Sequence, residues 1–287
     1  MAELRAVPSL KQCLLIGEDQ DEIRWVKPES CADSPFEWAS ITKTLTASIA
    51  RRLALEDAID LVLPVAAQSS RLAEAPAWVT PMSLLCHTSG LPRMPEGMND
   101  RKDPYKGMTR ERLADQLPSV WAAVDGPGDP ASVSYSNLGY ALLTLLLEEA
   151  SGSDWSDLAA TQLKSMGISE GVYVSPPEGG LVLKSVLGRK RLPWSLGDGA
   201  FIGAGGLWGT LDALAAYGQA SRTWWKSNSV EGLPLGWLSS DGYWSHTGGS
   251  RDTSAILVFN DNLVLAASTI GFGPFESEKI ARKALGR

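Results

Sequence analysis

The last third of the chain alternates short apolar runs with polar turns, which is the pattern of antiparallel strands. We predict four strands there, at 235–237, 243–246, 254–259 and 263–267. Two more apolar runs, separated by Gly17 and polar residues, predict a hairpin near the start of the chain, at 10–16 and 22–26. Strands therefore lie at both ends of the chain.

Helical spacing of apolar residues marks the other regular elements. We predict helices from about 41 to 55, with a start near Ser40, and at 138–150, 212–220 and 276–285. The stretch 64–134 is rich in proline and glycine and predicts an irregular, partly helical region, while 171–200 reads as mostly loop.

These elements predict an α+β fold in which one antiparallel sheet is built from both chain ends and flanked by helices. We expect a single unit over 1–287. Residues 1–59 and 201–287 would form the sheet region, and about 60–200 would form a mostly helical or irregular insert.

The composition and charge of the chain exclude several classes of function. The chain has 287 residues, 44% of them hydrophobic, so it can bury a large core. The formal net charge of -7 and the lack of long basic runs argue against nucleic-acid binding. The most apolar stretch, 141–147, is too short to cross a bilayer, so we expect no membrane partner. We see no basic leader followed by a long apolar run, and therefore expect a cytoplasmic protein.

Cysteine and histidine usage excludes several site types. Three cysteines, at 13, 31 and 86, are odd in number and widely spaced, which fits reduced thiols. The only histidines are His87 and His246, and neither lies in a zinc motif. We therefore expect no metal and no cofactor, and we interpret His87 as a residue that orders its loop.

Ser40 and Lys43 form the only Ser-x-x-Lys motif of the chain. Three residues apart on a helix, the two side chains lie on one face. A serine hydroxyl becomes a nucleophile when a base takes its proton, and a desolvated lysine with a lowered pKa can do so. The alternative is a serine that caps the helix beside a solvated lysine.

Tyr135 and Asn137 stand at the start of the helix predicted at 138–150. A Tyr-x-Asn triplet supplies a phenol that can carry a proton and an amide that can anchor a polar substrate. Alternatively, the tyrosine packs under the helix and Asn137 caps it.

The third motif is His246-Thr247-Gly248-Gly249, within a predicted strand. Glycine in a strand lets a ligand approach the backbone, and an exposed N–H group there can polarise a carbonyl. The alternative is a turn between two strands.

The order and spacing of the three motifs resemble the penicillin-recognising serine hydrolases: class C β-lactamases, low-molecular-mass D,D-peptidases and β-lactamase-like esterases. Three flanking segments add to the resemblance, LLCHTSGLP at 84–92, YSNLGY at 135–140 and AGGLW at 204–208. The resemblance covers about 10–285 and implies a β-lactamase/transpeptidase-like fold.

By this resemblance, Ser40 is the acylated nucleophile, Lys43 is its partner and Tyr135 is the proton carrier. Asn137 would contact the substrate, and the N–H groups of Ser40 and Gly249 would form the oxyanion hole. No metal takes part in this chemistry.

Gly248 belongs to the same implied substrate-binding strand, and Thr247 would contact a carboxylate or carbonyl of the substrate. His246 stands where the family usually has lysine. Histidine is mostly neutral at pH 7, so the usual fixed charge for a β-lactam or peptide carboxylate is absent there.

Together with the expected cytoplasmic location, this favours a serine hydrolase that acts through an acyl-enzyme on a small ester or amide. The alternatives are an acyltransferase, a D,D-peptidase or β-lactamase on the same machinery, and a non-catalytic acyl-binding sensor. The oligomeric state stays open.

Two further patterns are interpreted as decoys. Gly167–Gly171 matches Gly-x-Ser-x-Gly, but no buried strand precedes Ser169 and two prolines soon follow, so we predict a surface turn. The glycine-rich run 203–209 lacks the third glycine of a dinucleotide fingerprint, because Trp208 occupies that place.

Overall fold

A computed structural model of the chain describes residues 2–17, 24–26, 33–98, 102–129, 132–197 and 199–286. Two compact units are present. The sheet unit consists of Met1–Thr42, Leu163–Pro193 and Gly205–Arg287, and the helical unit consists of Lys43–Gln162 and Trp194–Ala204. Cys31 and the first two residues of the strand predicted at 22–26 lie outside the described residues.

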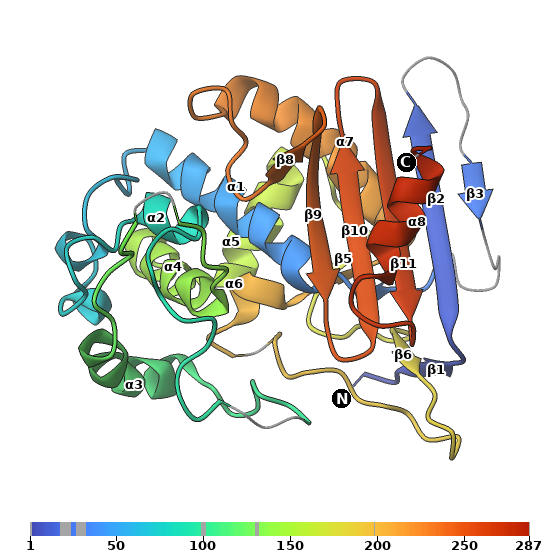
Figure 1. Cartoon of the computed structure of the whole chain (residues 1–287), viewed down its shortest axis with the longest axis horizontal. Coiled ribbons are helices and arrows are strands. Elements are labelled where there is room, and N and C mark those ends of the chain that lie inside the picture. Colours follow the sequence, from blue (N-terminus) through green and yellow to red (C-terminus); the bar gives the residue numbers. More distant parts are fainter. Residues whose placement is uncertain are drawn as a thin grey trace. The chain divides into compact units, whose positions relative to one another are not determined.

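The sheet unit contains one six-stranded antiparallel sheet (Figure 1). In spatial order its strands are β3 (Arg24–Val26), β2 (Leu10–Gly17), β11 (Leu263–Ile270), β10 (Thr253–Phe259), β9 (Tyr243–Gly249) and β8 (Leu238–Ser240). Strand β2 pairs with β11 over eight residues, from Leu10 opposite Ile270 to Gly17 opposite Leu263. The prediction that both chain ends share one sheet is confirmed.

One predicted strand is wrong. Residues 235–237 form a turn with Gly236 at φ 78°, and the strand begins at Leu238. Trp237 is buried beside Phe259, with ring centroids 4.7 Å apart. The apolar run that predicted a strand is therefore a turn whose side chains enter the core.

Helices cover both faces of this sheet, with α8 (Glu276–Ala284) in front and α7 (Leu211–Asn228) behind in the view of Figure 1. Strand β10 is consequently buried along its whole length. Gly218 of α7 leaves room for the sheet, because a Cβ there would come within 2.7 Å of side-chain atoms of Leu257 and Val264. Helix α7 extends eight residues beyond its predicted end at 220, with Ser221 and Trp225 continuing its buried face.

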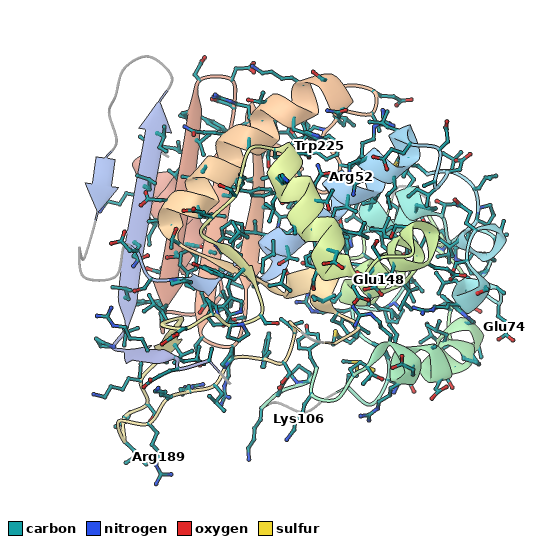
Figure 2. The ribbon with its side chains drawn as sticks, turned by 180° about the vertical axis from the view of Figure 1, so that it is seen from behind. Arg52, Glu74, Lys106, Glu148, Arg189 and Trp225 are labelled. Carbon is teal, nitrogen blue, oxygen red and sulfur yellow. The ribbon has the colours of Figure 1, made fainter. Side chains whose placement is uncertain are left out.

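The sheet unit also has strands of two or three residues that the sequence did not predict. Strand β1 (Arg5–Val7) pairs in parallel with β6 (Leu181–Leu183). A separate sheet has the order β4 (Phe36–Glu37), β7 (Leu207–Gly209) and β5 (Val172–Val174). After β6 the chain makes an exposed hairpin, from which Arg189 extends outward (Figure 2).

The helices of the helical unit and its borders are α1 (Thr42–Leu55), α2 (Pro81–Leu85), α3 (Arg110–Ala122), α4 (Asn137–Ser151), α5 (Trp155–Ser165) and α6 (Ile202–Gly205). Two 3₁₀ turns are η3 (Val65–Ala67) and η4 (Ser70–Leu72). The predictions for α1 and α4 are confirmed to within one residue, whereas α5 was not predicted. No helix among the described residues is long and apolar enough to cross a bilayer.

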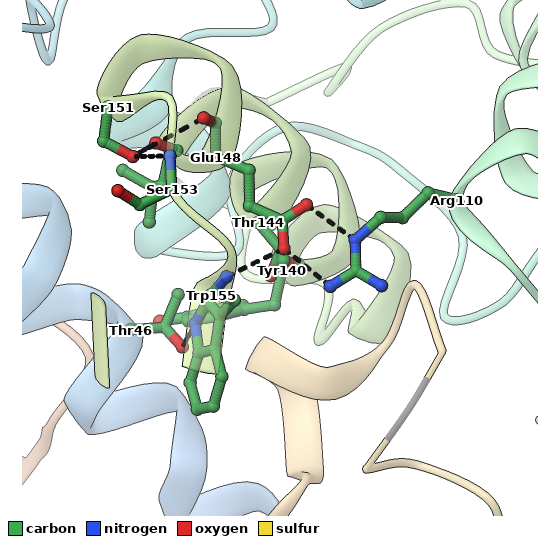
Figure 3. A network of polar contacts seen from close by, with 9 residues as sticks. Thr46, Arg110, Tyr140, Thr144, Glu148, Ser151, Ser153 and Trp155 are labelled. Carbon is green, nitrogen blue, oxygen red and sulfur yellow. Dashed lines mark hydrogen bonds and ion pairs between the residues drawn. The ribbon is translucent and has the colours of Figure 1, made fainter. Parts of the chain in front are cut away.

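A polar network holds α1 in the helical unit (Figure 3). The buried carboxylate of Glu148 accepts hydrogen bonds from the guanidinium of Arg110, at 2.6 and 2.7 Å, and from the backbone N–H of Trp155. The Trp155 indole donates to the hydroxyl of Thr46, which donates to the carbonyl of Gly203. Thr46 follows Lys43 by one helical turn, so this network fixes the helix that carries the lysine.

Candidate active site

Ser40 lies in a single 3₁₀ turn, η2 (Ala39–Ile41), that leads directly into α1. Ala39 has φ 47°, in the left-handed region that costs a residue with a Cβ roughly 1–2 kcal/mol. It is also buried, while Ser40 is half-buried. The predicted helix start near Ser40 is confirmed, and the strained backbone lies immediately before the serine.

The His246-Thr247-Gly248-Gly249 motif forms the last four residues of β9, so its interpretation as a turn is wrong. Strand β9 packs against η2 through Gly248. A Cβ on Gly248 would overlap the carbonyl oxygen of Trp38 and lie 3.3 Å from the backbone nitrogen of Ser40. Only glycine permits this approach, which brings the backbone of β9 beside that of the serine.

We expect Gly248→Ala to destabilise the protein by about 1–3 kcal/mol, because the added methyl group meets backbone atoms that no side-chain rotation can move. Gly249→Ala is the matched control, since a Cβ there would first meet Pro274 at 3.5 Å, an ordinary contact. Thermal unfolding of both variants measures the difference. Equal melting temperatures would show that β9 and η2 separate at little cost.

The two polar side chains of this motif have partners of their own. His246 is 5% exposed, and its Nδ1 lies 2.9 Å from the carbonyl oxygen of Thr247. The hydroxyl of Thr247 donates to Oε1 of Glu278 in α8, at 2.9 Å. Because a hydroxyl has one hydrogen, this bond leaves Thr247 only as an acceptor and places a carboxylate next to it.

Lys43 is completely buried, so the alternative of a solvated lysine is wrong. Its Nζ donates to the carbonyl of Ala204 at 2.6 Å and lies 5.0 Å from the ring centroid of Tyr135 and 5.4 Å from that of Tyr140. Burial lowers the pKa of Lys43 well below 10.5, and the positive charge of Arg93 lowers it further. The neutral amine, which can accept a proton, is therefore favoured.

The loop before α4 carries the second motif. Ser136 caps the helix, accepting from the N–H of Gly139 and donating to the carbonyl of Pro92, so the expected alternative cap, Asn137, is instead the first helical residue. The Nδ2 of Asn137 donates to the hydroxyl of Tyr105 at 3.0 Å. Its Oδ1 is buried and has no hydrogen-bond partner in the described part of the chain, so this atom is an unused acceptor.

His87 orders this loop, as the sequence predicted. Its Nδ1 accepts the backbone N–H of Ser136 at 3.1 Å, and its ring lies 4.4 Å from the ring of Tyr135. Burial is the main cause that lowers the pKa of His87 to about 3, and the nearby basic groups of Lys43 and Arg93 contribute less. The imidazole is therefore neutral and orients the tyrosine.

The sequence did not point to Arg93. Its guanidinium carbon lies 5.1 Å from the ring centroid of Tyr135. Its carbonyl accepts the N–H groups of Asn137 and Leu138, which ties the loop at 93 to the start of α4. No charge pattern marks a single arginine after Leu-Pro, so only the folded chain shows that it lies beside the tyrosine.

The structure thus brings Lys43, Tyr135 and Asn137 together in the helical unit, and Ser40 and residues 246–249 in the sheet unit. Ser40 and Lys43 are three residues apart where η2 joins α1. The roles predicted for these residues stay predictions. Ser169 is exposed in the short connection between α5 and β5, which confirms the predicted surface location of its motif. No group of three metal-binding side chains occurs among the described residues.

Comparison with known proteins decides the family. The profile of the Beta-lactamase family matches residues 24–286. The chain belongs to this family. D-alanyl-D-alanine-carboxypeptidase/endopeptidase AmpH of Escherichia coli (strain K12) is 29% identical over 158 residues, which are 53% of this chain and 40% of that relative. The match thus spans less than half the length of the curated relative.

Solved structures confirm the predicted β-lactamase-like fold. An octameric penicillin-binding protein homologue from Pyrococcus abyssi has a TM-score of 0.73 at 20% identity, covering 98% of this chain and 74% of its own. A β-lactamase/D-alanine carboxypeptidase from Yersinia pestis has a TM-score of 0.70 at 19% sequence identity, and the match covers 91% of this chain and 86% of the other. A D-stereospecific amidohydrolase from Streptomyces sp. has a TM-score of 0.69 at 21% sequence identity, and the match covers 92% of this chain and 89% of the other.

Proposed function

We propose that this Beta-lactamase family member is a serine hydrolase that forms an acyl-enzyme at Ser40 with a small ester or amide. The observation that carries the proposal is Lys43, three residues after the serine, which is fully buried and has a pKa lowered well below 10.5. Strongly lowered lysine pKa values of this kind are concentrated at functional sites, because burial of a lysine favours the neutral form that a base needs.

In this mechanism the neutral amine of Lys43 takes the proton of the Ser40 hydroxyl as its oxygen attacks the substrate carbonyl. The N–H groups of Ser40 and Gly249 stabilise the negative charge on the carbonyl oxygen. Tyr135 gives its phenol proton to the leaving oxygen or nitrogen as the bond between that atom and the acyl group breaks, and the Lys43 ammonium returns a proton to the phenolate. In deacylation, Tyr135 and Lys43 accept one proton from the attacking water, the bond between the acyl group and the Ser40 oxygen breaks, and the proton is passed to that oxygen, which restores the Ser40 hydroxyl and releases the acid.

Asn137 provides the substrate contact, because its buried Oδ1 would accept an N–H group of the substrate. Related proteins include a D-alanyl-D-alanine carboxypeptidase and a D-stereospecific amidohydrolase. Peptidase action on D-amino-acid amides is therefore the second candidate, and acyl transfer to an amine or alcohol would use the same intermediate. A cytoplasmic location and the absence of nucleic-acid and membrane partners remain predictions.

Mass spectrometry of the intact protein after exposure to a fluorophosphonate or a penicillin tests the proposal. A mass increase is expected with the probe, and digestion of the labelled protein should place the adduct on the peptide that contains Ser40. With an ester substrate, the acyl adduct should form and then disappear as it is hydrolysed. An acyl-enzyme that forms and never clears, with the ester substrates as well as with penicillin, would favour the acyl-binding sensor. No adduct with any serine probe would contradict the enzyme.

We expect Tyr135→Phe to slow deacylation at least as much as acylation, by about 10²-fold or more, because the phenol carries the proton in both steps. His87→Gln is an informative companion, since it removes the ring against Tyr135 but leaves the phenol. Stopped-flow acylation and steady-state turnover of p-nitrophenyl acetate separate the two steps. An unchanged kcat in Tyr135→Phe would show that Lys43 alone moves the proton.

A further inference from the structure

Arg93 brings a fixed positive charge to the residues of the proposed site. Its guanidinium carbon and the Nζ of Lys43 lie 5.1 and 5.0 Å from the centroid of the same ring, that of Tyr135. The residue is exposed, while Lys43 is fully buried. Of these two basic side chains beside the tyrosine, Arg93 is therefore the one that an incoming molecule can reach without a conformational change.

In the part of the chain that the structure describes, no carboxylate forms an ion pair with Arg93. The carboxylate of Asp103 instead accepts hydrogen bonds from the backbone and hydroxyl of Ser195. Burial is the main cause that lowers the pKa of Lys43 and His87, and the charge of Arg93 lowers both further. At Tyr105, burial raises the pKa and the charge of Arg93 partly offsets that rise.

The strand that the family resemblance assigns to substrate capture lacks this charge. His246 occupies the place usually held by lysine, and Thr247 has already given its hydrogen to the carboxylate of Glu278. An anionic group of a substrate would therefore meet a histidine and a glutamate at this strand. Any fixed cation for an acidic substrate must come from another residue.

We propose that Arg93 selects substrates that carry an ionised carboxylate, as a specificity-determining residue of the site. The inference rests on the proposed acyl-enzyme function. A guanidinium offers two parallel N–H donors that match the two oxygens of a carboxylate, and such bonds are stronger than those between neutral groups. The substrate class is thus an acidic ester or amide, in contrast to the neutral substrates that His246 alone would favour.

The test compares matched substrate pairs that differ in one charge. The first pair has the carboxylate on the leaving group, as a depsipeptide with a free terminal carboxylate and its amide. The second has it on the acyl group, as a p-nitrophenyl hemisuccinate and its methyl ester. Second-order acylation rates are measured at one pH for wild type, Arg93→Gln, Arg93→Lys and Arg71→Gln. Arg71, an exposed arginine of η4, controls for the loss of one positive charge.

In at least one pair the preference for the acidic substrate should fall about tenfold or more in Arg93→Gln, and partly return in Arg93→Lys. It should stay at the wild-type value in Arg71→Gln. The wild-type preference should also weaken in 0.5 M salt, because ions screen exposed charges. The affected pair shows which half of the substrate Arg93 contacts.

Equal ratios in wild type and Arg93→Gln for both pairs, with acylation intact, would overturn the role of Arg93 and leave the serine hydrolase standing. The role of Arg93 would also be wrong if both members of each pair slowed equally. Absence of acylation of wild-type Ser40 by every substrate and serine probe would instead contradict the proposed function, and the inference with it.

Discussion

Ser40→Ala is expected to reduce kcat for ester turnover by about 10³-fold or more, because no acyl-enzyme can form without the hydroxyl. The substitution removes one half-buried oxygen and leaves the backbone N–H of residue 40 in place. Binding and the oxyanion contact should therefore survive, and KM should change much less than kcat. Steady-state kinetics with p-nitrophenyl esters measures both parameters.

Ser169→Ala is the matched control. Ser169 is the serine of the Gly-x-Ser-x-Gly match and is exposed in the turn before β5. Its replacement should leave turnover within a few-fold of wild type. A dead Ser169→Ala enzyme together with an active Ser40→Ala enzyme would contradict the assignment of the nucleophile.

Lys43→Met should abolish turnover about as completely as Ser40→Ala, because nucleophile and base act as one unit and their losses do not add. The same variant should change the pH dependence of stability. Lys43 has a lower pKa in the folded protein than in the unfolded chain, so the unfolded chain binds more protons. The free energy of unfolding therefore rises with pH between these two pKa values.

For one proton the slope is about 1.4 kcal/mol per pH unit. The destabilising contribution of Lys43 is absent above pH 10.5 and grows as the pH falls toward its folded value. Methionine removes this contribution, so the free energy of unfolding of Lys43→Met should rise relative to that of the wild type as the pH falls. The variant also leaves the carbonyl of Ala204 without its hydrogen bond, which lowers its free energy of unfolding by an amount that does not change with pH. The test is therefore the pH dependence of the stability difference and not its absolute value.

Urea unfolding at several pH values measures the slope. Lys164→Met is the control, because Lys164 is exposed in the last turn of α5 and should show no pH-dependent difference from wild type. Parallel stability curves for wild type and Lys43→Met would show that the lysine keeps its proton in the folded protein. The role of Lys43 as a base would then be wrong.

Elements with strong local patterns could be predicted from the sequence. Strands β2, β10 and β11 each contain an apolar run, at 13–16, 255–259 and 263–267, close to turn residues. Helix α4 is mostly apolar between 138 and 147 and is ended by Gly152 in the left-handed conformation. The pattern that predicts each of these elements lies within the element's own residues. The motif residues were found for the same reason, since Ser-x-x-Lys and Tyr-x-Asn are patterns of neighbours.

Short elements could not be predicted this way. Strands β4, β5 and β7 have two or three residues each, too few for alternation to show, and they exist because distant segments pair. Helix α7 continues past 220 because Ser221 and Trp225 find a buried place. Their extents depend on partners that are remote in the sequence.

In the candidate site, too, some properties follow from neighbouring residues and others arise only in the folded chain. The prediction of Ser40, Lys43 and Tyr135 as site residues rests on residue type and spacing, which are local properties. Only tertiary structure buries Lys43 completely, places Arg93 against the ring of Tyr135 and engages Thr247 with Glu278. Burial and electrostatic fields come from residues far away along the chain, so the pKa of a base and the charge that meets a substrate arise only when the chain folds.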